Sequence, residues 1–170
     1  IDIRQVVHES RALPRSYLSG LNFLLNEQQD KAVDAFIEAV KIDPQTVELH
    51  FALGSLFRRR GETDRAIRMH QNLVDREDLS DDQRLQALAE LGQDHLKAGL
   101  LDRAEAVFLR LRETRLNDLA MRFLLEIYQQ EKDWAKAIEA ANALPDHESV
   151  LWRKEVANFH CELATSARAS

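Results

Sequence analysis

Residues 49–73 read LHFALGSLFRRRGETDRAIRMHQNL and hold the pattern of one complete helical hairpin. Apolar or ring-bearing residues at i, i+3, i+4 and i+7 predict a stripe along a first helix, formed by His50, Leu53, Gly54 and Phe57. A facing stripe on a second helix is formed by Ala66, His70 and Leu73. Gly61, inside the polar run RRRGETD, is expected to end the first helix. The stretch therefore predicts two helices packed against each other.

The pattern of this hairpin recurs along the chain. Ala66 lies 34 residues after Ala32, and Ala104 lies 38 residues after Ala66, so four residues are inserted before the third hairpin. A period of about 34, with a Leu-Gly pair, an aromatic residue three positions later and a small residue twelve after the Gly, is the tetratricopeptide signature. In the inserted stretch, Ser80 and Gln83 predict a capping box that restarts the helix.

The expected fold is an all-α solenoid of about four and a half tetratricopeptide repeats, wound as a right-handed superhelix. A lead-in is expected at residues 1–12 and the repeat array at 13–170. The repeats are placed at about 13–46, 47–80, 85–117 and 118–146, with a half repeat at 148–169. In the fourth repeat Leu125 stands where the others carry Gly, which leaves close packing of that hairpin open.

The amino-acid composition limits the classes of function that this chain can have. The chain has 23 Lys and Arg against 29 Asp and Glu, a net charge of −6, which disfavours a general nucleic-acid-binding role. Its single cysteine, Cys161, excludes an internal disulfide and a Cys-rich metal site, and is expected to be packed in the last helix. Neither a catalytic motif nor an apolar run near 18 residues occurs. We therefore expect a non-enzymatic protein without a cofactor in this part of the chain.

The first helix of each repeat lines the concave face of such an array, where partners bind. Residues displaced by one position from each core stripe are expected to face this groove. They are predicted to form the partner-binding site: Tyr17, Leu21, Phe51, Ser55, Arg58, Arg59, Gln93, Arg122, Glu126 and Gln129. The mixture of apolar, basic and polar side chains suits a protein or peptide ligand.

Two other candidate sites are suggested by the sequence, one formed by histidines and one by arginines. His50 and His70 lie on facing stripes, so a metal or acid–base site competes with plain core packing, and packing is favoured because a third ligand is missing. Five arginines gather at the second hairpin: Arg58, Arg59, Arg60, Arg65 and Arg68. They suit a partner or lipid headgroup, or a solvated helix end.

Four segments carry a closer resemblance: GLNFLLNEQQDKAVDAF, LGSLFRRRGETDRAIRMHQNL, AGLLDRAEAVF and FHCELA. In them the chain resembles the lipopolysaccharide assembly protein B (LapB) family over nearly its whole length. Members of that family have an N-terminal membrane helix, a cytoplasmic tetratricopeptide array and a C-terminal rubredoxin-like metal domain. The resemblance implies that the chain is the middle part, and that residues 1–12 follow a membrane anchor.

The resemblance also implies a function. It implies an adaptor on the cytoplasmic face of the bacterial inner membrane that brings the deacetylase LpxC to the protease FtsH, with its own rubredoxin-like domain as an internal partner. A generic scaffold for another envelope or secretion assembly is the alternative. The last helix, which lacks a following partner helix, is also expected to pair with a second copy of the chain.

Overall fold

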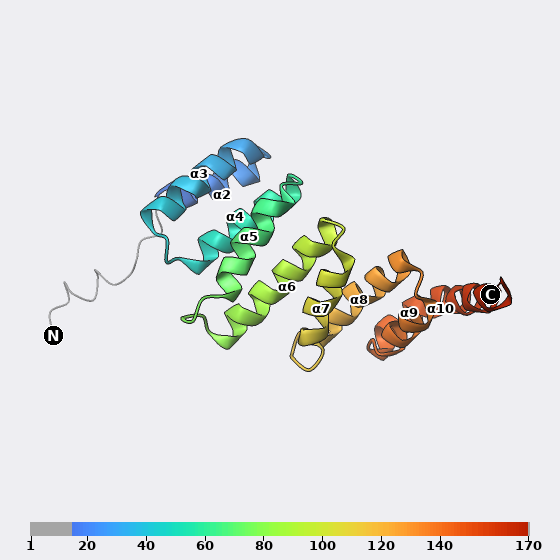
Figure 1. The fold of residues 1–170 in the computed structure, drawn as a ribbon. Coiled ribbons are helices and arrows are strands. Elements are labelled where there is room, and N and C mark those ends of the chain that lie inside the picture. The colour runs from blue at the N-terminus through green and yellow to red at the C-terminus, as the bar shows by residue number, and fades with distance from the viewer. Residues whose placement is uncertain (1–14, 170) are drawn as a thin grey trace. The chain divides into compact units, whose positions relative to one another are not determined.

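The computed structural model describes residues 15–169, with the side chains of residues 17, 29, 146–151, 166 and 169 excepted. These residues form helices and no strand (Figure 1). The helices are α2 (Arg15–Leu25), α3 (Gln29–Ile42), α4 (Val47–Arg59), α5 (Thr63–Val74), α6 (Asp81–Lys97), α7 (Leu101–Leu111), α8 (Asn117–Glu131), α9 (Trp134–Asn142) and α10 (Asp146–Ala169). The all-α prediction is confirmed, and the predicted lead-in at 1–12 lies outside the described residues.

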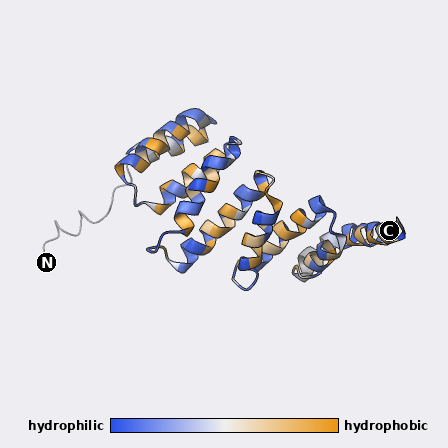
Figure 2. Cartoon of the chain, viewed as in Figure 1, coloured by the Kyte–Doolittle hydropathy of each residue, from blue (hydrophilic) through white to orange (hydrophobic). Residues whose placement is uncertain are grey.

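The chain divides into two compact units, residues 1–69 and 70–170, and the division falls within α5. In the first unit α2 packs against α3, and α3 packs against α4. Its core consists of buried residues of α3 and α4 and Ala66 of α5, with apolar residues of α2 packed against them. Hydrophobic and hydrophilic residues alternate along these helices (Figure 2). Leu49, Leu53, Leu56 and Phe57 of α4 are all buried there. His50 is only half-buried, so its predicted place in the core stripe is wrong, because Leu49 takes the buried position beside it.

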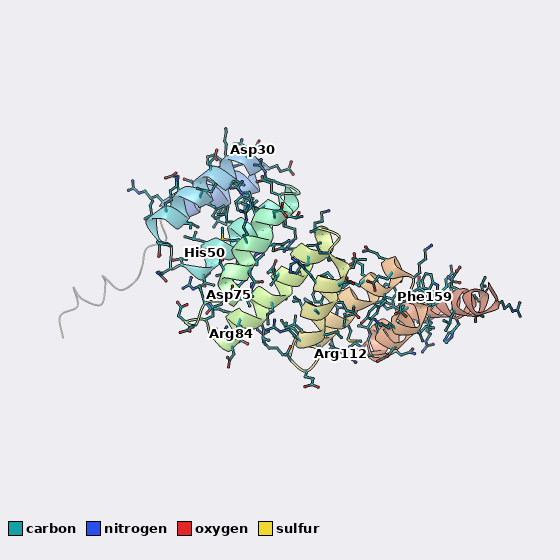
Figure 3. The ribbon with its side chains drawn as sticks, in the orientation of Figure 1. Asp30, His50, Asp75, Arg84, Arg112 and Phe159 are labelled. Carbon is teal, nitrogen blue, oxygen red and sulfur yellow. The ribbon has the colours of Figure 1, made fainter. Side chains whose placement is uncertain are left out.

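In the second unit successive helices from α6 to α10 pack pairwise. The ring of Phe108 is fully buried and stacks on Phe123 with ring centroids 4.8 Å apart. Phe159 of α10, which is labelled in Figure 3, stacks on Trp134 of α9 with ring centroids 5.6 Å apart. Cys161 of the same helix is exposed, so its predicted packing is wrong: it lies off the face of α10 that Phe159 turns to α9.

A left-handed residue closes the turn of every hairpin. Gly61 and Gly99 take positive φ, as expected of glycine, and so do two non-glycine residues, Glu27 (φ 57°) and Lys132 (φ 59°). In each turn, the backbone N–H of the residue that follows the left-handed residue donates to the carbonyl five positions before it, at 2.8–2.9 Å. The accepting carbonyls belong to Phe23, Phe57, His95 and Tyr128. These residues fill the aromatic position of the repeat, so one position both packs the hairpin and closes it.

The inserted stretch between the second and third hairpins is held from both sides. Ser80 caps α6 with the predicted capping box, in which the side chains of Ser80 and Gln83 each bond to the other's backbone N–H. The Arg84 guanidinium donates to the carbonyls of Val74 and Arg76, both at 3.0 Å. Arg84 thus satisfies the carbonyl of Val74, the last residue of α5, and the carbonyl of Arg76 just beyond the helix.

Candidate functional site

The predicted groove residues of the first unit lie on α2 and α4. Leu21 and Arg59 are exposed, whereas Phe51, Ser55 and Arg58 are half-buried. The side chain of Tyr17 lies outside the described part. Partial exposure on first helices is what a peptide-binding surface needs, because such side chains retain contacts that orient them. Their role as a binding site stays a prediction.

In the second unit the predicted residues lie on α6 and α8. Arg122 and Glu126 are exposed, whereas Gln93 and Gln129 are half-buried. The Gln93 amide donates to the carbonyl of Ala89 at 3.4 Å, and Glu126 accepts a long bond of 3.5 Å from Gln130. Polar side chains with only local, long bonds can exchange them for a partner at little cost.

The arginines at the second hairpin are largely engaged within the first unit. Arg60 lies 2.5 Å from Asp30 and 2.8 Å from Glu62, and Arg65 lies 2.5 Å from Glu62. The Arg65 guanidinium also stacks over the Phe57 ring at 3.9 Å. These contacts favour the interpretation of the basic run as a helix end over a cluster that binds a partner or a lipid headgroup. Arg59, which is one of the predicted groove residues, is exposed.

The two histidines considered as a candidate metal or acid–base site have different hydrogen-bond partners. His50 Nδ1 lies 2.9 Å from the carbonyl of Thr46 (Figure 3). His70 Nδ1 lies 2.5 Å from Asp94 Oδ2, and both side chains are fully buried. Among the side chains that the structure describes, no cluster of three or more His, Cys, Asp or Glu is placed to hold a metal. The His70–Asp94 pair links α5 to α6 and was not foreseen from the sequence.

A second polar cluster, also unforeseen, joins three helices of the second unit. The Tyr128 hydroxyl of α8 donates to Glu105 of α7 at 2.9 Å, and Lys136 of α9 lies 3.1 Å from the same oxygen and 5.0 Å from the Tyr128 ring. Burial raises the pKa of Tyr128 well above its usual range, and the bond to Glu105 raises it further. Glu105 likewise raises the pKa of Lys136. Because both pKa values are raised, the Tyr128 hydroxyl stays neutral and the Lys136 amine stays cationic at neutral pH.

The buried ring of His95 makes stability depend on pH. Burial lowers the pKa of His95, the charge of Arg103 lowers it further, and Asp94 opposes both. The folded state then binds fewer protons than the unfolded state. The contribution of His95 to the free energy of unfolding is fully present above the unfolded-state pKa of about 6.5. It is lost as the pH falls through the lowered pKa of the folded state.

We therefore expect His95→Phe, which keeps a ring in the aromatic position, to flatten the loss of stability on acidification. Urea unfolding midpoints of the chain and the variant, measured on both sides of the unfolded pKa, test this. His160→Phe, at an exposed position, is the matched control. An acid-induced loss that His95→Phe leaves unchanged would contradict the assignment.

No helix within residues 15–169 combines the length and the apolar character that a bilayer crossing requires. Two family models, both described as tetratricopeptide repeat, match residues 49–83 and 89–148. Together they cover more than half of the chain, from the second hairpin to the start of α10.

Curated relatives carry one name. Lipopolysaccharide assembly protein B of Escherichia coli K12 is 49% identical over 163 residues, which is 95% of this chain and 42% of the relative. The protein of the same name from Haemophilus influenzae is 37% identical over 166 residues, 92% of this chain and 42% of the relative. The chain thus spans about 42% of the length of these relatives.

Solved structures show the fold. MamA aligns with a TM-score of 0.64 and 20% identity over 88% of this chain and 84% of that one. A Podosopora anserina kinesin light chain with nearly identical TPR-like repeats aligns with a TM-score of 0.70 and 15% identity, over 92% and 89%. The helical solenoid and the predicted resemblance to lipopolysaccharide assembly protein B are both confirmed, and the chain belongs to the tetratricopeptide-repeat family.

Proposed function

We propose that this chain is the repeat part of a non-enzymatic adaptor in lipopolysaccharide assembly, which binds other proteins through its first helices. The observation that carries the proposal is the 49% identity to lipopolysaccharide assembly protein B over 95% of the chain. Tetratricopeptide arrays bind protein partners along the surfaces of their stacked repeats, which supports an adaptor rather than a catalyst.

The mechanism we propose is recruitment. One partner is the deacetylase LpxC and the other is the membrane protease FtsH, so that holding both raises the local concentration of substrate at the protease. The exposed and half-buried side chains of α2, α4, α6 and α8 supply apolar, cationic and amide groups for this purpose. Chemistry at a peptide bond would belong to the protease, and the adaptor would set which protein it meets.

We place this adaptor on the cytoplasmic face of the inner membrane, attached through an N-terminal anchor. A rubredoxin-like metal domain would belong to the remaining length of the protein. The chain described here does not fit such a metal itself, because rubredoxin-like sites use four cysteine thiolates and this sequence has only Cys161.

The decisive experiment changes the first helix of the second repeat. Phe51→Ala and Arg58→Ala together, placed in the full-length protein, are expected to weaken partner binding by about 2 kcal/mol, since aromatic and Arg side chains concentrate binding energy. Cells carrying the double variant should then degrade LpxC more slowly. The measurement is the LpxC half-life after translation is stopped, beside a circular dichroism melt of the 170-residue chain.

The matched control is Arg68→Ala with Asn72→Ala, two exposed positions on the second helix, α5. A control with a normal half-life, beside a slowed half-life and a near-normal melt for the Phe51 and Arg58 variant, supports recruitment through this face. An unchanged half-life in both would show that the predicted groove does not recruit. Co-purification that yields envelope proteins but neither LpxC nor FtsH would favour a scaffold for another assembly.

A further inference from the structure

A pocket of about 230 Å³ lies in the second unit, between α7, α8 and α9. The lining residues of α8 are spaced by three and four positions, as are those of α7 together with its C-cap residue Arg112. On α9, Glu139 and Ala140 follow Lys136 by three and four positions, so each of the three sets presents one helical face to the pocket. On α8 that face is made of Met121, Leu124 and Tyr128. The predicted groove uses Arg122, Glu126 and Gln129, which are displaced by one or two positions and point elsewhere around the helix. The pocket is therefore a surface distinct from the groove.

The size and lining of the pocket limit what it can hold. Sites for cofactors and drug-sized ligands usually occupy about 300 to 1,000 Å³, so this pocket is too small for most of them and suits a single large side chain. Its floor is apolar, because Met121, Leu124 and Ala140 line it and are each at most 3% exposed. Leu109, at the edge, is 41% exposed and offers further apolar contact.

The two cations of the lining differ in how they are held. Lys136 lies 3.1 Å from Glu105 and 3.7 Å from Asp133, so its charge is already matched. Arg112, which is labelled in Figure 3, approaches Glu139 only to 3.9 Å, beyond hydrogen-bond distance. Both side chains are exposed. The planar guanidinium can take a carboxylate with two parallel bonds. Arg112 is thus the lining cation best placed to bind an incoming acid.

We propose that this pocket docks a partner protein segment that inserts one large apolar side chain and sets a neighbouring Asp or Glu on Arg112. The apolar floor selects the inserted side chain, and the loosely paired guanidinium selects the acid beside it. The surface goes beyond the adaptor role proposed above, because it uses different residues and depends on neither LpxC nor FtsH. Either proposal can fail without the other.

The test uses nuclear magnetic resonance of the ¹⁵N-labelled chain. The probe is an acetylated and amidated peptide, Gly-Ser-Gly-Asp-Leu-Asp-Gly-Ser-Gly, titrated to about 5 mM, because contacts of this size correspond to millimolar dissociation constants. Saturating shifts are expected at the amides of Leu109, Arg112, Leu124 and Ala140. Replacing both acids of the peptide by Asn, or its Leu by Ala, should abolish saturation.

Variants of the chain separate the pocket from general electrostatics. Arg112→Glu should weaken binding about fivefold, since an exposed ion pair is lost. Arg110→Glu is the matched control: it makes the same change of charge at an exposed residue two positions away that does not line the pocket. It should leave binding within a factor of about two, because exposed charges outside direct contact are screened.

Three outcomes would overturn the proposal. The first is a lack of saturation with the acidic probe. The second is an equal effect of Arg110→Glu and Arg112→Glu, which would mean that the peptide senses only the overall charge. The third is binding confined to a probe that ends in a free Leu carboxylate, which would make the site a reader of chain ends instead of internal acids.

Discussion

Replacement of Gly92 by leucine is expected to lower the free energy of unfolding by about 3 kcal/mol, the upper part of the usual range for overpacking. Even a single Cβ at Gly92 would lie 2.7 Å from Cζ of Phe108, closer than such atoms pack. Phe108 cannot withdraw, because its ring is fully buried and stacked on Phe123. The gain in helix propensity on replacing Gly, up to about 1 kcal/mol, is too small to offset the clash.

The fourth hairpin shows how the same position accepts leucine. Gly20 and Phe36 repeat the close contact of Gly92 and Phe108, with a built Cβ 2.9 Å from the ring, and both pairs are sixteen residues apart. At the same offset Leu125 is matched by Ala141, and both are buried on the packed helices α8 and α9. The packing left open by Leu125 is thus kept by exchanging a small–large pair for a large–small one.

A double-mutant cycle tests this exchange. Phe108→Ala alone should cost about 3 to 5 kcal/mol because it leaves a cavity. Gly92→Leu combined with Phe108→Ala should be more stable than Phe108→Ala, since leucine fills the space that the ring vacates. Urea denaturation of the three variants gives the coupling, and Ala106→Leu, at an exposed position, controls for the added side chain. Strictly additive losses would contradict the pairing.

Asp94→Ala is expected to lower the free energy of unfolding by about 3 kcal/mol, the scale for breaking a buried polar pair. The change removes the carboxylate that meets Nδ1 of His70 at 2.5 Å, in a place where neither side chain reaches solvent. Urea denaturation measures the loss. Asp82→Ala is the matched control, because Asp82 is an exposed acid in the first turn of the same helix, α6.

An apolar replacement of the pair should recover much of this loss. His70 lies at the repeat position that holds Phe36 and Phe108 in the neighbouring hairpins, so His70→Phe restores the usual residue. We expect His70→Phe with Asp94→Ala to be more stable than Asp94→Ala alone, because a buried polar pair replaced by apolar groups is often close to neutral. A double variant as unstable as the single one would show that Asp94 acts through other contacts.

The local features of this fold follow from the sequence by itself. The 34-residue spacing of Ala32 and Ala66, the Gly61 turn and the Ser80 capping box each rest on contacts a few residues apart or on helical periodicity. Such short-range physics can be read from residue types. The left-handed conformation of Glu27 and Lys132 could not be predicted from residue types, because a non-glycine residue takes that conformation only when the packed hairpin holds it there.

The tertiary structure decided what depends on residues far apart in the chain. His70 meets Asp94 across 24 positions, and Tyr128 meets Glu105 across 23. Periodicity assigns each residue to a face but gives no distance between side chains on different helices. Whether a buried histidine has a carboxylate beside it, and whether three helix faces leave a pocket at Arg112, depends on how side chains of different size fill the space between helices.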